Sequence, residues 1–588
     1  MAKMRTKLTS LPAMVVMALV LLAIIAACSS DDPTPTNTIA PTATSGPGVT
    51  STPGATPTAT SAPVVQPKYG GILRVAHRAD VPAAWDTMRS TNYNLTPLTS
   101  AIAGEGNLVQ ACFADETTIC PAFAESWEVN DDFTVWTFKV RDGLTFHDGA
   151  PLTAEEFRYW IDLFVNGAKV GDKVRLPGVA KSQFGDFKNV ETLDGNRVRI
   201  TLNTPDAFYL DSLGMHRIPI FHPKHLFEPA IQAGNVDVTP SEFGNIGAGP
   251  FKFVSYERGV GIEVERFDDY YEKDEDGNQL PFLDGIEYSI LSDPAAFHAA
   301  FRTGRLDVGA RGQGYYVSQD MVPQYQASLP GDVYFMEIAG GESAGLGFNT
   351  MEGPFVDKRL REAISLWIDR QSSIDTLNLG NGRIRAGFLD TTNSTPGYLT
   401  WPGYNPATKE ADKAKARQLI ADAGAQGLDF TIILPNTQVT AMEWWVGAID
   451  GLGISADLQV MDVTAFDARK AGTDWIANWT GGSLDLGTPS SVNFAFGRKS
   501  DSPYAGMVHE DAKVAQLAQS LGDVTTNEDR LRILREIEAY IFKEQFYMIH
   551  GSVGVSLIPA RGYVKGAKAA FVLNPPTYAS FARTWMDK

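Results

Sequence analysis

The chain has 588 residues, and its 69 Asp and Glu against 50 Lys and Arg give a formal net charge of −19. This balance argues against a nucleic-acid-binding protein, because such proteins depend on clustered Lys and Arg. A single hydrophobic core stops growing at about 250–300 residues, so the length predicts two or more lobes.

Residues 1–27 have the layout of a secretory signal. Three Lys and Arg residues precede an apolar run over 11–27, which ends in small residues before Cys28. A charged segment followed by an apolar one is typical of a signal peptide. The ending looks like a bacterial lipobox, so we predict that Cys28 becomes a lipidated N-terminus. An uncleaved transmembrane helix is the alternative, but the run is short for a span of about 20 residues.

Residues 28–67 are predicted to be a disordered tether. Within 29–67, 23 of 39 residues are Ser, Thr or Pro, and the charges are those of Asp31 and Asp32. Such a composition buries too little apolar surface to offset the entropy lost on ordering. Proline favours extended backbone, so we expect a semi-rigid spacer, with or without O-glycosylation, between a membrane and a folded body.

Two cysteines, Cys112 and Cys120, remain for the folded body. They stand eight positions apart in a chain predicted to be exported, and disulfides persist outside the cytoplasm. We therefore predict a small disulfide loop. A free reactive pair and a metal site are the alternatives, and a metal would need more ligands than Asp115 and Glu116 supply.

The body alternates predicted strands and helices, which indicates an α/β fold. A first strand is expected over 71–76, and alternating apolar residues over 127–140 predict a strand–turn–strand unit. A helix is expected to begin at Thr153, because Thr153 and Glu156 have the spacing of a capping box. Apolar residues from Phe157 onward follow at helical spacing.

Three blocks of this region resemble a known family. Residues 121–127, 136–143 and 146–156 are similar to the signature of family 5 extracellular solute-binding proteins, the receptors of ABC importers for oligopeptides, dipeptides and nickel. Further similar segments follow in the order of the family, at 247–257, 348–370 and 404–424.

The resemblance implies an α/β fold, a two-lobed periplasmic-binding-protein-like clamshell of type II with a subdomain inserted in lobe one. A ligand would bind between the lobes, and ligand-dependent closure would present a changed surface to a permease. The expected boundaries are 68–109, 241–340 and 501–588 for lobe one, 110–240 for the inserted subdomain and 341–500 for lobe two.

Open α/β sheets bind ligands at the carboxyl ends of their strands, which directs attention to three segments. One follows the first strand, one follows the apolar run over 431–434, and one covers 475–485. Asn349 is added from the segment that resembles the entry to lobe two. Of the adjacent Trp444 and Trp445, one is expected to face the core. The candidate ligand-binding residues are Trp85, Tyr93, Asn94, Asn349, Asn436, Trp444, Trp475, Trp479 and Asp485.

The last segment departs from the family in one respect. Residues 479–485 resemble the cleft motif Trp-x-x-Asp-Tyr-x-Asp-Pro, whose first Asp holds the α-amino group of the peptide in peptide-binding relatives. Gly482 stands at that position, and a buried ammonium without a carboxylate is costly. Asp485 is the carboxylate that could replace it. A peptide stays the first candidate ligand, with an oligosaccharide-like or other organic solute as the alternative.

A different class is suggested by residues 341–345, whose Gly-x-Ser-x-Gly pattern around Ser343 matches the nucleophile elbow of an anchored serine hydrolase, with His509 or His550 as the base. That elbow opens into a helix, whereas the residues after Ser343 are predicted to form strand and turn, so an enzyme is not expected. A surface sensor or adhesion module without a role in transport is the other alternative.

The sequence thus predicts an extracytoplasmic, lipid-anchored, monomeric binding protein that delivers a small molecule to ABC permease subunits. No catalytic residue and no cofactor are expected. No metal site is expected either, because the eight His are scattered and the one close pair, His222 and His225, suits surface structure better than nickel.

Overall fold

The structure, a computed structural model, describes residues 66–588 except 78–79, 82–84, 91–94, 96–100, 105–107, 113–117, 179–180, 215–221, 310–316, 339–344, 390–394, 481–488, 499–506 and 568–580. The predicted signal peptide, Cys28 and nearly all of the tether therefore lie outside the described residues. No helix in the described part of the chain combines the length and the apolar character needed to cross a membrane.

The first sheet is built on the first predicted strand. β1 (Ile72–His77) pairs in parallel with β12 (Gly285–Ile290), and β11 (Gly261–Arg266) and β10 (Phe251–Glu257) extend the sheet in antiparallel order. The apolar residues that alternate along these strands are buried together in one hydrophobic core. This sheet carries the first of the three candidate ligand-binding segments, which follows β1.

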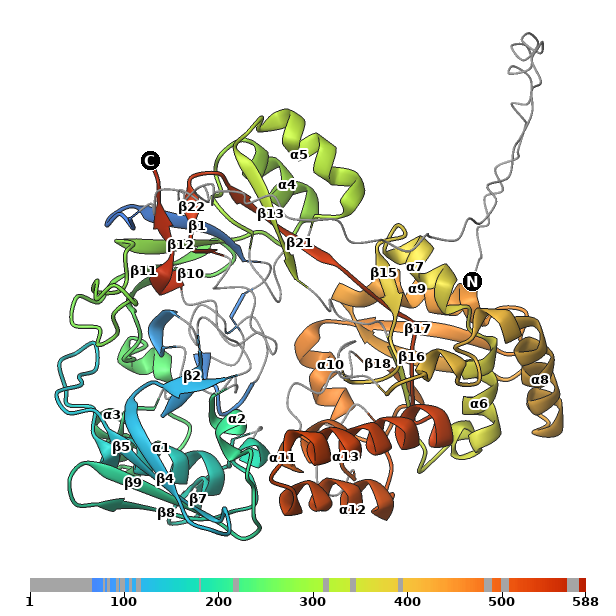
Figure 1. Ribbon diagram of the computed structural model, residues 1–588, viewed down its shortest axis with the longest axis horizontal. Helices are drawn as coiled ribbons and strands as arrows, with labels where there is room; N and C mark the ends of the chain where they lie inside the picture. Colours follow the sequence, from blue (N-terminus) through green and yellow to red (C-terminus); the bar gives the residue numbers. More distant parts are fainter. Residues whose placement is uncertain are drawn as a thin grey trace, which may run out of the picture. The chain divides into compact units, whose positions relative to one another are not determined.

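The range expected to form the inserted subdomain contains a separate sheet. Its strands lie in the order β4 (Ala124–Val129), β5 (Val135–Val140), β9 (Arg197–Leu202) and β8 (Phe187–Leu193), and β4 and β5 are the predicted strand–turn–strand unit. Helix α1 (Ala154–Asn166) packs on this sheet and buries an aromatic-rich cluster, which we call the subdomain core (Figure 1).

Helix α1 begins where the sequence predicts, but it is capped differently. Thr153 is the N-cap residue, yet its side chain makes no capping hydrogen bond. The backbone N–H of Ala154 donates instead to Oδ1 of Asn196 (2.8 Å), and Glu156 accepts from the backbone N–H of Lys224 (2.7 Å). Tertiary contacts have therefore replaced the hydrogen bonds of the expected capping box.

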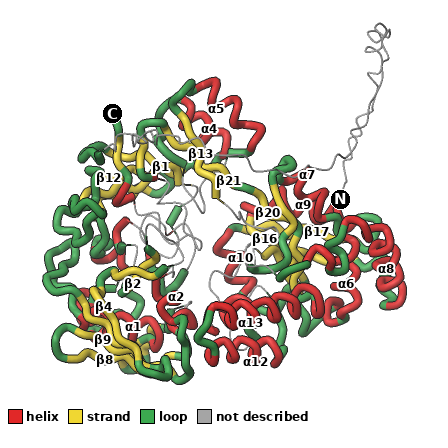
Figure 2. Tube along the Cα trace, in the orientation of Figure 1, coloured by secondary structure: helices red, strands yellow, loops and turns green. Residues whose placement is uncertain are grey.

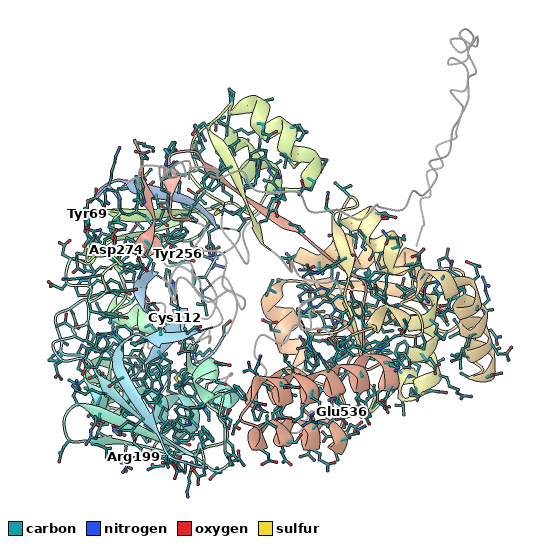
Figure 3. The ribbon with its side chains drawn as sticks, in the orientation of Figure 1. Tyr69, Cys112, Arg199, Tyr256, Asp274 and Glu536 are labelled. Carbon is teal, nitrogen blue, oxygen red and sulfur yellow. A yellow bond between two sulfur atoms is a disulfide. The ribbon has the colours of Figure 1, made fainter. Side chains whose placement is uncertain are left out.

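Cys112 and Cys120 are joined by a disulfide, as predicted (Cys112 is labelled in Figure 3). The bond lies at the end of a two-stranded ribbon of β2 (Val109–Ala111) and β3 (Ile119–Pro121). The remaining helices and strands of this part of the chain are β6 (Ala168–Val170), β7 (Lys173–Arg175), α2 (Tyr209–Gly214) and α3 (Lys224–Gln232).

The second large sheet has five strands, parallel and antiparallel, and three hydrophobic clusters contain its residues. One cluster holds the helices α6 (Lys358–Trp367), α8 (Lys409–Asp422) and α9 (Val439–Ile449), which appear as helices beside the sheet in Figure 2. The strand order is β17 (Ser455–Met461), β16 (Asp429–Pro435), β18 (Ala477–Thr480), β14 (Gly345–Phe348) and β19 (Met548–His550).

The chain stays with the second sheet for longer than the sequence predicts. We expected 501–588 to return to lobe one, but β19 pairs with β14. Helices α12 (Ala512–Ser520) and α13 (Asn527–Ala539) pack with Met548 of β19 and with α11 (Pro489–Phe496) in a second cluster, which we call the helical cluster. The boundary at 500 was wrong because β19 has three residues and pairs far away in the sequence, which no local pattern reveals.

The two large sheets are connected by a pair of crossing strands. β13 (Val333–Ile338) precedes β14 of the second sheet, and β21 (Ser556–Arg561) carries the chain back to pair with β13 in antiparallel order. We call this pair the crossing ribbon. The other helices and strands are α4 (Pro294–Arg302), α5 (Val322–Ser328), α7 (Arg370–Leu377), β15 (Gly382–Ile384), α10 (Val463–Lys470), β20 (Ser552–Gly554), β22 (Val564–Lys565) and β23 (Trp585–Met586).

Asp206, a buried acid next to α2, makes the stability of the fold depend on pH. Its side chain accepts a hydrogen bond from the backbone N–H of Phe208 (3.0 Å) and is 3% exposed. Burial, helped by the charge of Asp211 and opposed by that of Arg530, raises the pKa of Asp206 to about 7. The folded protein therefore keeps a proton that the unfolded chain has lost, so the free energy of unfolding should fall as the pH rises from about 4 to about 7.

Asp206→Asn is expected to remove this pH dependence. The variant should be more stable than the wild type at pH 8, by up to about 4 kcal/mol, because one pKa unit corresponds to about 1.4 kcal/mol. Near pH 4 the two proteins should have similar stability. Calorimetric melts of both proteins at pH 4, 6 and 8 check this, and a constant difference at all three values would contradict it.

Candidate functional site

The carboxyl ends of β16 and β18 lie at the same edge of the second sheet, because these neighbouring strands run parallel. This is the edge at which open α/β sheets bind ligands. Asn436 follows β16 directly, and its side chain is exposed, so it lies where the sequence predicts. The chain that follows β18, over 481–488, lies outside the described residues.

The adjacent tryptophans of α9 divide as predicted. Trp445 has no exposed surface and belongs to the hydrophobic core, whereas Trp444 is half-buried. Their rings meet edge to face, with centroids 5.5 Å apart. Successive side chains of an α-helix point about 100° apart, so a hydrophobic core on one side of α9 buries one of the two tryptophan rings. Trp444 therefore keeps part of its ring exposed.

Trp479, at the carboxyl end of β18, has an unused hydrogen-bond donor. Its half-buried ring lies near Phe466 of α10, with centroids 6.1 Å apart. The Nε1 atom of Trp479 is buried and has no hydrogen-bond partner in the described structure. A buried donor without a partner costs about 1–3 kcal/mol, a cost that a ligand oxygen would remove.

Asn478, the residue before Trp479, is a polar residue that the sequence analysis did not select. It has no exposed surface, and neither Nδ2 nor Oδ1 has a hydrogen-bond partner among the described residues. Its neighbours across the sheet are Gly347 of β14 and Ile433 of β16. The available signal was an Asn among apolar residues, where an unpaired carboxamide is costly.

Trp85, predicted to contact the ligand, is 3% exposed. Its ring meets Phe253 and Tyr256 of β10 edge to face, with centroids 5.5 and 5.3 Å away (Tyr256 is labelled in Figure 3). The backbone of Trp85 has a φ of 67°, which is uncommon for a residue with a bulky side chain. The surrounding structure must hold such a conformation. At Trp85 it does so through the contacts of the next residue, Asp86.

The buried carboxylate of Asp86 holds this backbone segment in place. Its Oδ2 accepts from Nη2 of Arg175 (2.8 Å), and its Oδ1 lies 2.9 Å from Nε2 of His222 and accepts from the backbone N–H of Met88 (2.9 Å). Burial alone would raise the pKa of Asp86, but His222 and Arg175 together outweigh burial and hold it at about 2. This Asp86 cluster ties the segment after β1 to β7 and to the residues before α3.

Asn349 and Trp475 have structural roles that correct their selection as ligand contacts. Nδ2 of Asn349 donates to the carbonyl oxygens of Thr473 (2.9 Å) and Trp475 (3.0 Å), and its Oδ1 accepts from the backbone N–H of Met351 (3.0 Å). Nε1 of Trp475 donates to the carbonyl oxygen of Gly472 (3.1 Å). Both side chains are buried, and their polar atoms are already used within the protein.

The residues after Ser343 form a strand rather than the helix of a nucleophile elbow. β14 begins at Gly345 and pairs with β18 and β19. His509, considered as a base for Ser343, lies with its Nε2 2.9 Å from the carbonyl oxygen of Phe496, and its Nδ1 accepts from the backbone N–H of Asp511 (3.0 Å). Ser343 itself lies outside the described residues.

Three candidate ligand contacts, Tyr93, Asn94 and Asp485, also lie outside the described residues. Within the part of the chain that the structure describes, no group of three or more His, Cys, Asp or Glu is arranged to hold a metal ion. Among the candidate residues of the second sheet and its helices, Asn436, Trp444 and Trp479 keep exposed surface or an unpaired group, and Asn478 adds an unpaired carboxamide within the described structure.

Comparisons with known proteins place this geometry in a family. A family model described as bacterial extracellular solute-binding proteins, family 5, matches residues 118–504. Heme-binding protein A of Haemophilus influenzae is 26% identical over 504 residues, which cover 80% of this chain and 85% of that protein. Di/tripeptide-binding protein 1 of Pseudomonas aeruginosa is 26% identical over 398 residues, covering 64% of this chain and 69% of that protein.

Solved structures show the same fold. The periplasmic binding protein DppA of Helicobacter pylori, in complex with the peptide STSA, has a TM-score of 0.73 at 22% identity and covers 89% of this chain and 99% of that one. This likeness confirms the expected α/β clamshell of type II with two lobes. Because the family model matches more than half of the sequence, the chain belongs to the bacterial extracellular solute-binding proteins of family 5.

Proposed function

We propose that the protein is a lipoprotein, anchored to the cell membrane through Cys28, that captures a peptide or another small organic solute between its lobes and delivers it to an ABC importer. It acts as a monomer and without a cofactor. The match of the family model over residues 118–504 carries this proposal. The tether over 28–67 would give the folded body reach above the membrane.

Two residues of β18 with buried, unpaired polar atoms support a ligand site near the end of that strand. Nε1 of Trp479 and both amide atoms of Asn478 lack hydrogen-bond partners in the described structure. Successive side chains of a strand point to opposite faces, so the partly exposed Trp479 is the residue that would gain from a ligand with polar atoms. The partly free ring of Trp444 adds apolar surface suited to a side chain or a sugar face.

The protein is proposed to release its ligand unchanged. The named relatives are binding proteins, and β14 stands where a serine nucleophile would need a helix. Hydrolysis of a short ester that is lost in Ser343→Ala would overturn this part of the proposal.

A thermal-shift panel with di- to nonapeptides, oligosaccharides and heme tests the ligand class. A true ligand should raise the melting temperature with its concentration, as mass action requires. Native mass spectrometry of the purified protein identifies any ligand that copurifies. A panel in which no compound shifts the melt, together with an empty native spectrum, would contradict a peptide receptor.

Trp479→Phe is expected to weaken binding of the ligand found in that panel about fivefold, because it removes one hydrogen bond worth about 1 kcal/mol. The melting temperature without ligand should stay the same or rise, since the lost Nε1–H is buried and unpaired. Titration calorimetry and a melt measure the two effects.

Trp475→Phe is the matched control for this change. Its Nε1 is already paired with carbonyl oxygens of the protein, so its loss should lower the melting temperature and leave the dissociation constant unchanged. If Trp479→Phe instead destabilises the free protein and binds normally, Trp479 belongs to the core and the proposed site is wrong.

A further inference from the structure

A contact far from the crossing ribbon joins the subdomain to the helical cluster. Nη1 of Arg530, on α13, donates to Oδ2 of Asp211, on α2, at 2.6 Å. The guanidinium of Arg530 also lies over the ring of Phe208, 4.0 Å from its centroid. Both side chains of the ion pair are about four-fifths buried, so water screens the pair less than it screens a surface pair.

Arg530 is held in this position by its own helix. Its Nε and Nη2 both donate to Oδ1 of Asn527, one turn earlier in α13, at 3.1 and 2.7 Å. Because Asn527 fixes the guanidinium plane, less side-chain entropy is lost when Arg530 meets Asp211 and Phe208. The geometry is that of a preorganised contact rather than of a chance surface pair.

Two further contacts accompany the ion pair. Gly522, which follows α12, packs so closely on the subdomain that an added Cβ would lie 2.6 Å from the carbonyl oxygen of Pro205. The 3-10 helix Lys181–Phe184, whose Phe184 belongs to the subdomain core, packs against α11. Helices α11 and α13 of the helical cluster thus meet α2 and the 3-10 helix Lys181–Phe184 of the subdomain along one interface.

This interface has a mechanical consequence. The crossing ribbon links the first and second sheets through the chain itself, whereas the contact of Arg530 links the subdomain to the second sheet without a chain connection. Rotation of the two lobes about the ribbon must break the second link, so its strength sets how often the protein opens.

We propose that Asp211, Phe208 and Arg530 form a latch that fastens the inserted subdomain to the second lobe and favours the closed protein before any ligand binds. The latch then tunes the apparent affinity, because the fraction of binding-competent molecules scales the dissociation constant. It does not depend on the identity of the ligand, so its test needs none.

Arg530→Glu tests the latch in the purified protein without ligand. The change places a carboxylate against Asp211, so small-angle scattering should show a larger radius of gyration. Hydrogen exchange of α2 and α11 should speed up about tenfold, the change in an opening equilibrium expected from one lost charge-assisted hydrogen bond. Circular dichroism verifies that the variant is folded.

The control and the rescue use neighbouring residues. Arg532→Glu changes the same charge on the same helix, but its side chain is 63% exposed and pairs with Asp529, so it should leave both readouts as in the wild type. The double variant Asp211→Arg/Arg530→Asp should restore compactness and slow exchange. If Arg530→Glu behaves like Arg532→Glu, or if the charge swap restores neither readout, the latch does not exist.

Discussion

Replacing Asp86 by alanine is expected to lower the free energy of unfolding by about 3–5 kcal/mol, because it leaves a buried cation without its partner. The side chains of Asp86 and Arg175 are 0% and 3% exposed, and His222 is equally buried. The substitution should destabilise two parts of the chain, because the Asp86 cluster joins the segment after β1 to the subdomain. Calorimetry of the variant and the wild type measures it.

Asp237→Ala is the matched control. Asp237 also pairs with an arginine, Arg89, at 3.1 Å, but its side chain is 84% exposed, so its removal should cost less than about 1 kcal/mol. Equal losses for the two variants would show that burial of Asp86 contributes nothing.

The effect of Asp86→Ala should also depend on pH. Because the pKa of Asp86 is lowered from its usual value to about 2, the stabilisation is fully present above about pH 4 and is lost as the pH falls toward 2. The difference between variant and wild type should therefore shrink between pH 4 and pH 2. A difference that stays constant over that range would contradict a charged Asp86 as the cause.

Local sequence patterns predicted the features of this fold that depend on residues close together in the sequence. Spacing together with predicted export identified the disulfide of Cys112 and Cys120, and helical geometry allowed one of Trp444 and Trp445 in the core. The start of α1 was predicted correctly at Thr153, although its capping partners come from distant segments. Motifs that span several elements were enough to indicate the clamshell.

The sequence could not indicate which polar groups would already be satisfied in the folded chain. Asn349 and Trp475 were selected for their chemistry, yet their polar atoms bind nearby backbone groups. Asn478 was passed over, although its carboxamide lacks a partner among the described residues. These outcomes depend on distances between strands, and the same holds for the contact of Asp211 with Arg530, which no periodicity reveals.

Arg370 shows most clearly how much of this fold depends on such distant polar contacts. The side chain is 2% exposed, and its Nε donates to the carbonyl oxygen of His550 (2.9 Å). Its Nη1 donates to the carbonyl oxygens of Ser365 (3.0 Å) and Gly403 (2.7 Å), and its guanidinium lies 3.8 Å from the ring centroid of Tyr404. One residue thus joins α6, the segment before α8 and the end of β19, and burial lowers its pKa.

Arg370→Met should therefore lower the free energy of unfolding by about 3–5 kcal/mol, because three carbonyl oxygens lose this donor at once, although that of Gly403 keeps a second donor, Nζ of Lys409 (2.8 Å). Arg370→Lys keeps the charge but not the planar fork, so it should recover less than half of that loss. Arg532→Met, at an exposed position of α13, should change stability by no more than about 0.5 kcal/mol. If Arg370→Lys restores full stability, the positive charge stabilises the fold and the planar geometry of the guanidinium does not contribute. If Arg370→Met is neutral, the hydrogen bonds of Arg370 do not contribute to the stability of the second sheet and its helices.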